Sequence, residues 1–414
     1  MTRRVLGLHS TILLLAATHF VVDGFSNVLA PLLPLIIANQ HLSLAGAGTL
    51  QMCFLIANSV AQLGFGHVAD RWRPRLLLVA GPVVAVCILP FIGLAASPST
   101  LAAILVAGGL GAAAFHPPAA ALVHKLGAER TGLAMALHIT GGSLGFSLGP
   151  LLFAPIVQRY GLAWLPVVIV PALLALAVLL PRMPPIERLH ESHETGGFGA
   201  LRPYAKPLTL LYLIVVLRTL AAQAIGTFAP VMLTGQGLSI AEAASSISVF
   251  LIAASTGGFF GGPLADRFGA RRVIILSLVL AAPFLAVAPS LSGWPFVVVL
   301  SIGGFLLQST LPVNVTFGQR LAPISAATVS SLMMGFAWGT GGVCVPLVGM
   351  LADRIGIAPT LTTLSVLPLV AAGLAWPLPD RVGPPGTAQP LARPVAQSVA
   401  APVDVAGPTA VGTD

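Results

Sequence analysis

The chain has 414 residues, of which 56% are hydrophobic and only 8% are charged, whereas a soluble domain carries roughly 25% charged residues. This composition excludes an ordinary soluble protein, because too few polar side chains remain to cover a surface in water. The net charge of +8 comes without a basic helix or a basic-aromatic motif, so we expect no nucleic-acid partner and assign the charge to loops beside membrane spans.

Apolar stretches of about twenty residues recur along the chain, and this length crosses a bilayer core of roughly 30 Å. The sequence therefore predicts an all-α membrane protein with twelve transmembrane helices. The expected spans are residues 10–38, 46–66, 76–97, 100–125, 131–157, 162–180, 208–234, 242–264, 272–290, 293–319, 325–350 and 357–377. Asp23 interrupts the first stretch and no clear cleavage site follows, which favours an uncleaved helix over a signal peptide.

An internal repeat predicts two pseudo-symmetric six-helix bundles, residues 1–180 and 208–380. A shift of 196 residues places Gly66, Asp70 and Arg71 on Gly262, Asp266 and Arg267. The polar stretch 181–207 between the bundles is interpreted as a cytoplasmic linker. Residues 381–414 consist mainly of Pro, Ala, Gly and Val without periodicity, which predicts a disordered cytoplasmic tail.

Positive charge predicts the orientation in the membrane. With a cytoplasmic N-terminus, seventeen of the twenty Lys and Arg residues face the cytoplasm, Arg159 and Arg354 face outward, and Arg218 lies within the membrane. By the positive-inside rule, we expect both termini on the cytoplasmic side of the cell inner membrane.

Two charged residues, Asp23 and Arg218, fall well inside predicted spans. A charge at the centre of a span costs roughly 2.5–3.5 kcal/mol on insertion scales, so both are candidates for function. They occupy the first helix of each half, and the repeat places Asp23 opposite Thr219, the neighbour of Arg218. A direct ion pair is one expectation, and its role could be recognition, coupling or simple neutralisation of buried charge.

Three histidines join Asp23 as candidates for proton coupling. His19 lies one helical turn before Asp23, while His116 and His138 fall in the fourth and fifth spans. Together they provide titratable groups in an apolar protein, although each could also be a packing residue. Pro117 directly follows His116, which predicts a break or kink in the fourth span.

Amide side chains inside spans are candidates for binding a solute or for bonding helix to helix. Those we assign to solute binding, together with Arg218, are Gln51, Asn58, Gln223, Gln308 and Asn314. The sequence has no nucleophile constellation, no phosphate-binding loop and no metal-ligand spacing. We therefore expect neither an enzyme nor an ATP-driven pump, and no cofactor or metal. The linker contains His190 and His193 beside glutamates, and we interpret it as a solvated connector.

The segment from Gly262 to Arg272, with Asp266, Arg267 and Arg271, resembles the loop signature of the major facilitator superfamily. The corresponding segment keeps Gly66, Asp70, Arg71 and Arg75 but has Arg73 where that family has glycine. The resemblance implies a transporter fold in which these residues form a structural gate latch. Alternatively, the positive charges of these segments only determine the orientation of the chain in the membrane.

The fifth span, with Gly141, Gly145, Gly149 and Pro150, is similar to the glycine-rich motif of antiporters in that superfamily. Such glycines form a smooth face against which another helix can move, or they serve packing alone. The similarity favours export.

Shorter motifs resemble the fosmidomycin-resistance efflux branch of the superfamily. They are His19 to Gly24, Pro31 to Pro34, and Ala114 to Pro117. This resemblance implies proton-driven export of a drug or metabolite. We expect a small, possibly anionic solute that is moved by alternating access, and a monomeric protein. An importer or facilitator on the same fold is the alternative, and a membrane-embedded enzyme or receptor is the alternative from another class.

Overall fold

The computed structural model describes residues 4–5, 8–71, 74–127, 130–183, 198–322 and 326–379. Side chains are described for residues 9–69, 74–127, 130–183, 201–322 and 328–379. The predicted tail at 381–414 and most of the predicted linker therefore lie outside the described residues. So do the side chains of Asp70 and Arg71.

Twelve helical segments of the described chain are long and apolar enough to cross a membrane, which confirms the predicted number. They span Ser10–Gln40, Leu44–Ala69, Pro74–Leu94, Pro98–Gly127, Thr131–Tyr160, Leu162–Arg182, Leu201–Gly235, Ile240–Phe268, Ala270–Ser290, Gly293–Leu321, Thr328–Ile355 and Ile357–Ala375. The chain is thus a multi-pass membrane protein with an all-helical membrane region. A two-stranded antiparallel pair, β1 (Arg4–Val5) and β2 (Leu8–His9), precedes it.

The first half of the chain contains these helices: α1 (Ser10–Ser26), α2 (Leu29–Gln40), α3 (Leu44–Arg71), α4 (Pro74–Ile88), η1 (Leu89–Leu94), α5 (Pro98–Gly127), α6 (Thr131–Tyr160), η3 (Leu162–Val168), α7 (Ile169–Leu179) and η4 (Leu180–Arg182). The first span is made of α1 and α2, which are separated at Asn27 and Val28. Asn27 donates a hydrogen bond from Nδ2 to the carbonyl oxygen of Phe146, 2.9 Å away, so the interruption is tied to α6.

The second half contains η5 (Phe198–Tyr204), α8 (Ala205–Gly235), α9 (Ile240–Phe268), α10 (Ala270–Val287), η6 (Ala288–Ser290), α11 (Gly293–Gln308), α12 (Thr310–Leu321), α13 (Ala326–Ser330), η8 (Ser331–Phe336), α14 (Ala337–Val343), α15 (Val345–Ile355), α16 (Ile357–Leu364) and α17 (Val366–Ala375). Its tenth span is divided at Ser309, and η8 is a π-helical turn within the eleventh span. Turns of this kind often occur at functional positions in helices.

The predicted break near His116 is wrong, because α5 continues from Pro98 to Gly127 through Pro117 and Pro118. Proline is tolerated inside a membrane helix where neighbouring groups satisfy the backbone that it frees. The uninterrupted helix keeps His116 inside the bundle, facing α1.

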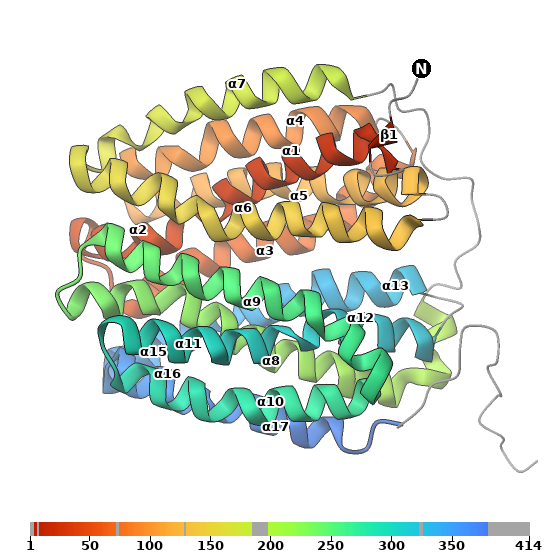
Figure 1. The fold of residues 1–414 in the computed structure, drawn as a ribbon. Coiled ribbons are helices and arrows are strands. Elements are labelled where there is room, and N and C mark those ends of the chain that lie inside the picture. Colours follow the sequence, from red (N-terminus) through yellow and green to blue (C-terminus); the bar gives the residue numbers. More distant parts are fainter. Residues whose placement is uncertain are drawn as a thin grey trace, which may run out of the picture. The chain divides into compact units, whose positions relative to one another are not determined.

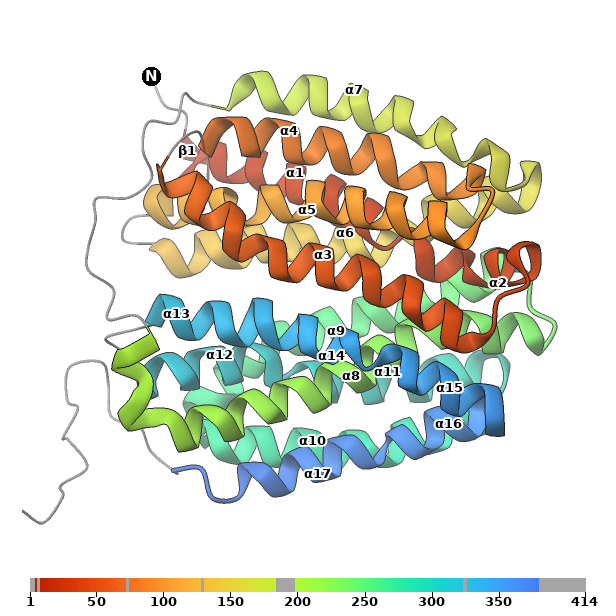
Figure 2. The same cartoon turned by 180° about the vertical axis from the view of Figure 1, so that it is seen from behind.

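The two halves form separate groups of helices that lie side by side (Figure 1; Figure 2). They touch where α3 packs against η8, α14 and α15, where α2 packs against α8 and α9, and where α6 packs against α9. We call the end of the bundle that carries Ser10, Arg71 and Pro74 the proximal end, and the end that carries residues 40–44 the distal end. The start of α1 and the ends of α7 and α17 all lie at the proximal end (Figure 1).

At the distal end, polar side chains of one half cap helix starts of the other. Asp353 of α15 accepts hydrogen bonds from the backbone N–H groups of Leu44, at 2.8 Å, and Ala45, at 3.0 Å. Gln158 of α6 accepts one from the N–H of Ala241 at 2.8 Å. A carboxylate at a helix N-terminus satisfies orphan donors and complements the helix dipole. These contacts hold the two halves together at the distal end.

Glycines four residues apart bring α6 against α1. A Cβ atom added to Gly141, Gly145 or Gly149 would lie 2.3, 2.0 or 2.2 Å from the carbonyl oxygens of Ala16, Phe20 and Gly24, respectively. Such distances leave no room for a side chain, and the neighbouring atoms belong to backbone. The glycine face is therefore packed against a helix of its own half, and the packing explanation of this motif fits the geometry.

Gly145→Ala is accordingly expected to destabilise the protein, because α1 and α6 would have to move apart. Overpacking of this kind costs about 1–3 kcal/mol or more. Gly132→Ala is the matched control in the same helix, since a Cβ there meets nothing within 4 Å. Thermal unfolding in detergent should show a lower midpoint for Gly145→Ala and an unchanged one for Gly132→Ala. Equal midpoints would contradict the packing.

Candidate functional site

A cavity lined by both apolar and polar side chains lies between the two halves of the chain. It has about 600 Å³ of space outside the atoms, part of it open to solvent. Its lining residues are Asn27, Ala30, Gln51, Phe146, Arg218, Thr219, Ala222, Gln223, Gly226, Thr227, Ile247, Phe250, Leu251, Ala254, Gln308 and Trp338. Both halves contribute, so a solute in this cavity would contact both.

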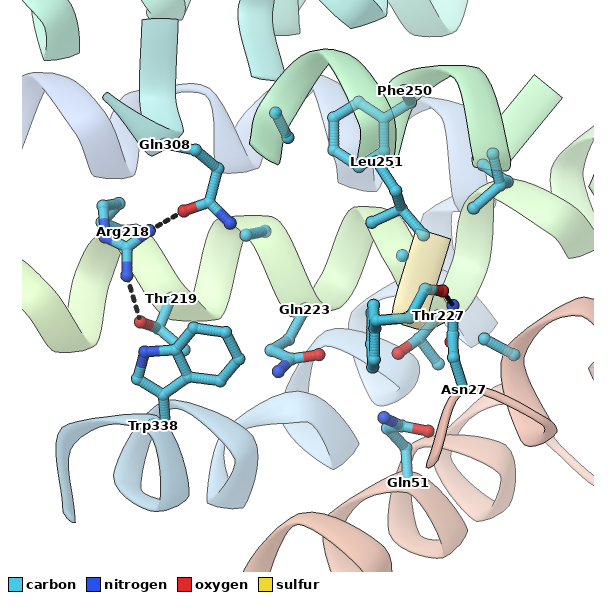
Figure 3. Close-up of a pocket in the computed structure, with 16 residues that line it drawn as sticks. Asn27, Gln51, Arg218, Thr219, Gln223, Thr227, Phe250, Leu251, Gln308 and Trp338 are labelled. Carbon is cyan, nitrogen blue, oxygen red and sulfur yellow. Dashed lines mark hydrogen bonds between the residues drawn. The ribbon is translucent and has the colours of Figure 1, made fainter. Parts of the chain in front are cut away.

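Arg218 is the charged residue of the cavity wall. It is fully buried on α8, where its guanidinium donates to Gln308 Oε1 and to Thr219 Oγ1, the latter at 3.2 Å (Figure 3). Its Nε–H has no hydrogen-bond partner, and among the described residues no carboxylate pairs with it. A buried cation without a counter-charge is costly. The cavity therefore presents a positive charge whose partner is missing.

Four of the six predicted solute-binding residues line the cavity: Gln51, Arg218, Gln223 and Gln308. The two others do not. Asn314 is fully buried on α12 with both amide atoms unbonded, and Asn58 lies on α3 away from the cavity lining. Their side chains carry the same amide group as the glutamines that line the cavity, but they lie on faces of their helices that do not line it.

Sequence reasoning missed Asn27, Thr219 and Trp338. Trp338, on α14, lies beside Thr219 and Arg218 (Figure 3). One signal was available for Asn27, because it follows Asp23 at the i, i+4 spacing that shares a helix face. Nothing in the sequence distinguishes Trp338 from a residue that faces lipid.

A second polar group lies within the first half, where His19, Asp23 and His116 converge. His19 Nε2 is 3.1 Å from Asp23 Oδ2, and His116 Nε2 is 3.6 Å from Asp23 Oδ1. The side chains keep 12%, 20% and 18% exposure, respectively, so none of the three is completely enclosed by the protein. The structure thus brings together three of the four predicted proton-coupling residues, from α1 and α5.

The contact between His19 and Asp23 requires a shared proton. His19 Nδ1 donates to the carbonyl oxygen of His138, 2.9 Å away, so a neutral His19 would carry no proton on Nε2. An unprotonated Nε2 and a carboxylate oxygen are both acceptors. A proton must therefore lie on Nε2 or on the carboxyl group to make this a hydrogen bond.

His138 and Gly142, both on α6, complete the surroundings of this pair. The ring of His138 is buried, and its centroid lies 4.3 Å from that of His19. A Cβ at Gly142 would lie 2.4 Å from His19 Nε2 and 2.7 Å from Asp23 Oδ2. The glycine of α6 therefore provides the space in which His19 and Asp23 meet.

The expected direct pair between Asp23 and Arg218 is not formed in this structure. Asp23 contacts His19 and His116, whereas Arg218 contacts Gln308 and Thr219. The repeat correctly relates the positions of the two residues along their helices. The partners of each side chain, however, all belong to its own half of the chain. The two charges belong to separate polar groups.

The two motif glycines near the proximal end are not closely packed. A Cβ at Gly262 would meet nothing within 4 Å, and one at Gly66 would lie 3.7 Å from Pro117, so neither glycine is required for a close approach between helices. In the second half, Gly257 and Gly261 provide it against the carbonyl oxygens of Phe305 and Ser309. Gly269, at a φ of 90°, makes the turn before α10, a conformation that favours glycine.

Asp266 pairs with Arg320 of α12 at 3.0 Å, and both side chains are exposed. Such pairs contribute about 0–1 kcal/mol. The other basic motif residues point elsewhere: the guanidinium of Arg267 lies over Phe268, that of Arg271 over Trp376, and Arg75 is exposed. Arg320 was not among the predicted motif residues, although it is the partner of the motif aspartate.

A twelve-helix bundle of two halves, with a cavity between them that contains a buried arginine, is the architecture of a membrane carrier. The model of the Major Facilitator Superfamily matches residues 15–239 and 211–403. The chain belongs to this superfamily, whose members are transporters of small solutes and not enzymes.

Relatives and solved structures agree with this assignment. The chain is 29% identical to an uncharacterized MFS-type transporter, YfnC, of Bacillus subtilis (strain 168), covering 89% of this chain and 92% of that protein. It is 29% identical to the fosmidomycin resistance protein of Escherichia coli (strain K12), covering 88% and 92%. Its fold is similar to the inward-facing crystal structure of a bacterial homolog to the human lysosomal transporter Spinster. That match has a TM-score of 0.74 at 18% identity over 88% of this chain and 95% of the other.

Proposed function

We propose that the protein is a proton-coupled exporter of a small anionic organic solute. The observation that carries the anionic cargo is Arg218, a buried guanidinium in the cavity wall with no carboxylate partner among the described residues. A planar guanidinium is suited to a carboxylate or phosphonate, which can accept two parallel hydrogen bonds. A bound anion would supply a counter-charge to this guanidinium.

The remaining cavity residues would hold the body of the solute. Gln51 and Asn27 from the first half and Gln223 and Gln308 from the second offer amide groups, while Trp338 offers an apolar face beside Arg218. Because both halves contribute, movement of one half relative to the other would release the solute. This is the requirement of alternating access.

Proton coupling is assigned to Asp23 with His19, His116 and His138. The pair of His19 and Asp23 holds a shared proton, and the side chains of His19, Asp23 and His116 are partly exposed. Titratable groups at membrane depth are otherwise scarce in this chain, which supports a role in moving protons. Asp23 lies one helical turn from Asn27, which lines the cavity. Protonation of Asp23 would therefore act close to the bound solute.

Gating is assigned to the two ends of the bundle. The caps that Asp353 and Gln158 provide join the halves at the distal end, and their release would open the cavity there. At the proximal end, Asp266 and Arg320, together with the basic motif residues, would change partners as the halves move.

Export is preferred over import because of the resemblance to the antiporter motif and because one relative is named a resistance protein. The packing of Gly141, Gly145 and Gly149 against α1 gives this preference no additional support. An importer on the same fold is therefore the second candidate, and the direction of proton movement distinguishes the two.

Counterflow in proteoliposomes tests the cargo class. Vesicles loaded with an unlabelled carboxylate or phosphonate should accumulate the same labelled compound, whereas the matched methyl esters should give no counterflow. Protein-free vesicles provide the baseline. Counterflow of the esters at the level of the acids would overturn the anionic assignment.

The proposed orientation is tested by cysteine labelling, because positive charge places the proximal end in the cytoplasm. Lys206→Cys is exposed near the proximal end, and Ser99→Cys is the matched exposed position in the first turn of α5, at the distal end. In intact cells, an impermeant maleimide should label Ser99→Cys and leave Lys206→Cys unlabelled until the cells are opened. The opposite pattern would contradict the orientation.

A further inference from the structure

We infer that His19, Asp23 and His116 form a binding site for one divalent transition-metal ion of the Zn²⁺ type. Spacing along the sequence does not predict this site, since the three residues come from two helices and show no metal-ligand spacing. In the structure, His19 Nε2, His116 Nε2 and an Asp23 carboxylate oxygen lie within 4.8 Å of one another.

The ligand atoms lie close to the spacing of a tetrahedral site. Bonds of about 2.0–2.2 Å to nitrogen and oxygen place neighbouring ligand atoms ~3.3–3.6 Å apart. His19 Nε2 is 3.1 Å from Asp23 Oδ2, His116 Nε2 is 3.6 Å from Asp23 Oδ1, and one ligand atom from each of the three residues lies within 4.8 Å of the others. Binding an ion therefore requires the three side chains to turn until one carboxylate oxygen faces both nitrogens. Three protein ligands would leave a fourth position for water.

The surroundings also fit a metal ligand. Metal-binding histidines almost always donate their second ring N–H to a carboxylate, a backbone carbonyl or water, which fixes the ring and its tautomer. His19 does so through Nδ1 to the carbonyl oxygen of His138 at 2.9 Å, which directs the Nε2 lone pair toward Asp23. Gly142 leaves open the volume beside His19 Nε2 and Asp23 Oδ2.

The donor set selects the kind of ion. Two imidazoles and one carboxylate suit Zn²⁺, Cu²⁺ or Ni²⁺, whereas Mg²⁺ and Ca²⁺ prefer sites made of oxygen. The side chains keep 12–20% exposure, so the site is not completely enclosed by the protein. All three ligands belong to the first half, so the ion does not connect the two halves. We therefore expect a bound ion to coordinate the Asp23 carboxylate without preventing movement of one half relative to the other.

The test is metal binding to the purified full-length protein in detergent. Titration calorimetry should show one high-affinity Zn²⁺ site that excess Mg²⁺ does not displace, and Co²⁺ should give the visible absorption of tetrahedral coordination. Loss of a second-shell partner alone typically costs about 10–100-fold in affinity, so loss of a ligand through His116→Gln or Asp23→Asn should cost at least about 100-fold.

His116→Cys reports on coordination directly. A thiolate at this position should bind the ion that His116→Gln fails to bind, and it should add a sulfur-to-cobalt charge-transfer band. The wild type should lack this band, because its cysteines, Cys53, Cys87 and Cys344, are not ligands of the proposed site. His124→Gln, exposed at the end of α5, is one control, and the double variant His190→Gln with His193→Gln in the linker is the other. Both should bind as the wild type does.

Retained Zn²⁺ affinity in His116→Gln and Asp23→Asn, or its loss in the linker variant, would overturn the site. Absence of the charge-transfer band in a folded His116→Cys protein would do the same. Binding does not depend on the proposed transport mechanism. Inhibition of proton-driven transport by Zn²⁺ does depend on it, so a bound ion that leaves transport unchanged would refute the coupling role of Asp23 and leave the metal site standing.

Discussion

Arg218→Gln is expected to weaken the binding of an anionic solute by about 10- to 100-fold, because a hydrogen bond to a charged group contributes about 1.5–3 kcal/mol. Arg218→Lys should lie between the wild type and Arg218→Gln, since lysine keeps the charge and loses the planar fork. Binding is measured by calorimetry with a carboxylate or phosphonate that the wild type transports.

The neutral methyl ester of the same compound is the matched control, and its weak binding should not change in Arg218→Gln. The structural alternative makes a different prediction. If Arg218 were needed to neutralise Asp23, its removal would destabilise the protein and Asp23→Asn would restore the stability. Because the two side chains have separate partners, we expect no such rescue. A rescued double variant with unchanged cargo affinity would reject Arg218 as the anion-binding residue.

Asp23→Asn is expected to abolish accumulation driven by a proton gradient while solute exchange continues. The asparagine can still bond to His19, whose own bond to the carbonyl oxygen of His138 is unaffected, so the fold should persist. What is lost is the group that accepts and releases the proton. In proteoliposomes with an imposed pH gradient, accumulation of the solute should fall to the level reached by exchange without a gradient. The part of the accumulation that the gradient drives should be lost completely.

Asp23→Glu is the control for this change, because it keeps a carboxyl group one methylene further out. It should retain a measurable response to the pH gradient. Driven accumulation in Asp23→Asn at the wild-type level, with the wild-type pH profile, would show that Asp23 is structural and would move the coupling role to His116.

The fold was predictable because the bilayer imposes a simple pattern. Twelve apolar stretches gave twelve spans, with most boundaries correct to within a few residues, since nearly every transmembrane helix must be long and apolar. Departures occur where helices are irregular. The interruption at Asn27 and Val28 and the π-helical turn at Ser331–Phe336 depend on tertiary contacts, and hydropathy does not register them.

The site was predictable only in part. Spacing along one helix correctly joined His19 to Asp23, because i, i+4 neighbours share a face. It could not show that His116, from another helix, would complete the cluster, or that Arg218 would bond to Gln308, since these contacts depend on how α5 and α11 are rotated. The proposed pair of Asp23 with Arg218 failed for the same reason: the repeat relates positions along helices but does not determine the direction of each side chain.

The central claim is that movement of an anionic solute is coupled to opposite movement of protons. The most direct measurement follows the internal pH of proteoliposomes with a trapped fluorescent indicator after a transported phosphonate is added outside, without an imposed gradient and with protein-free vesicles as the control. Antiport predicts that the lumen becomes more alkaline as solute enters, and that Asp23→Asn and Arg218→Gln lack this response. A lumen that becomes more acidic would support the importer, and solute entry without any pH change would contradict proton coupling altogether.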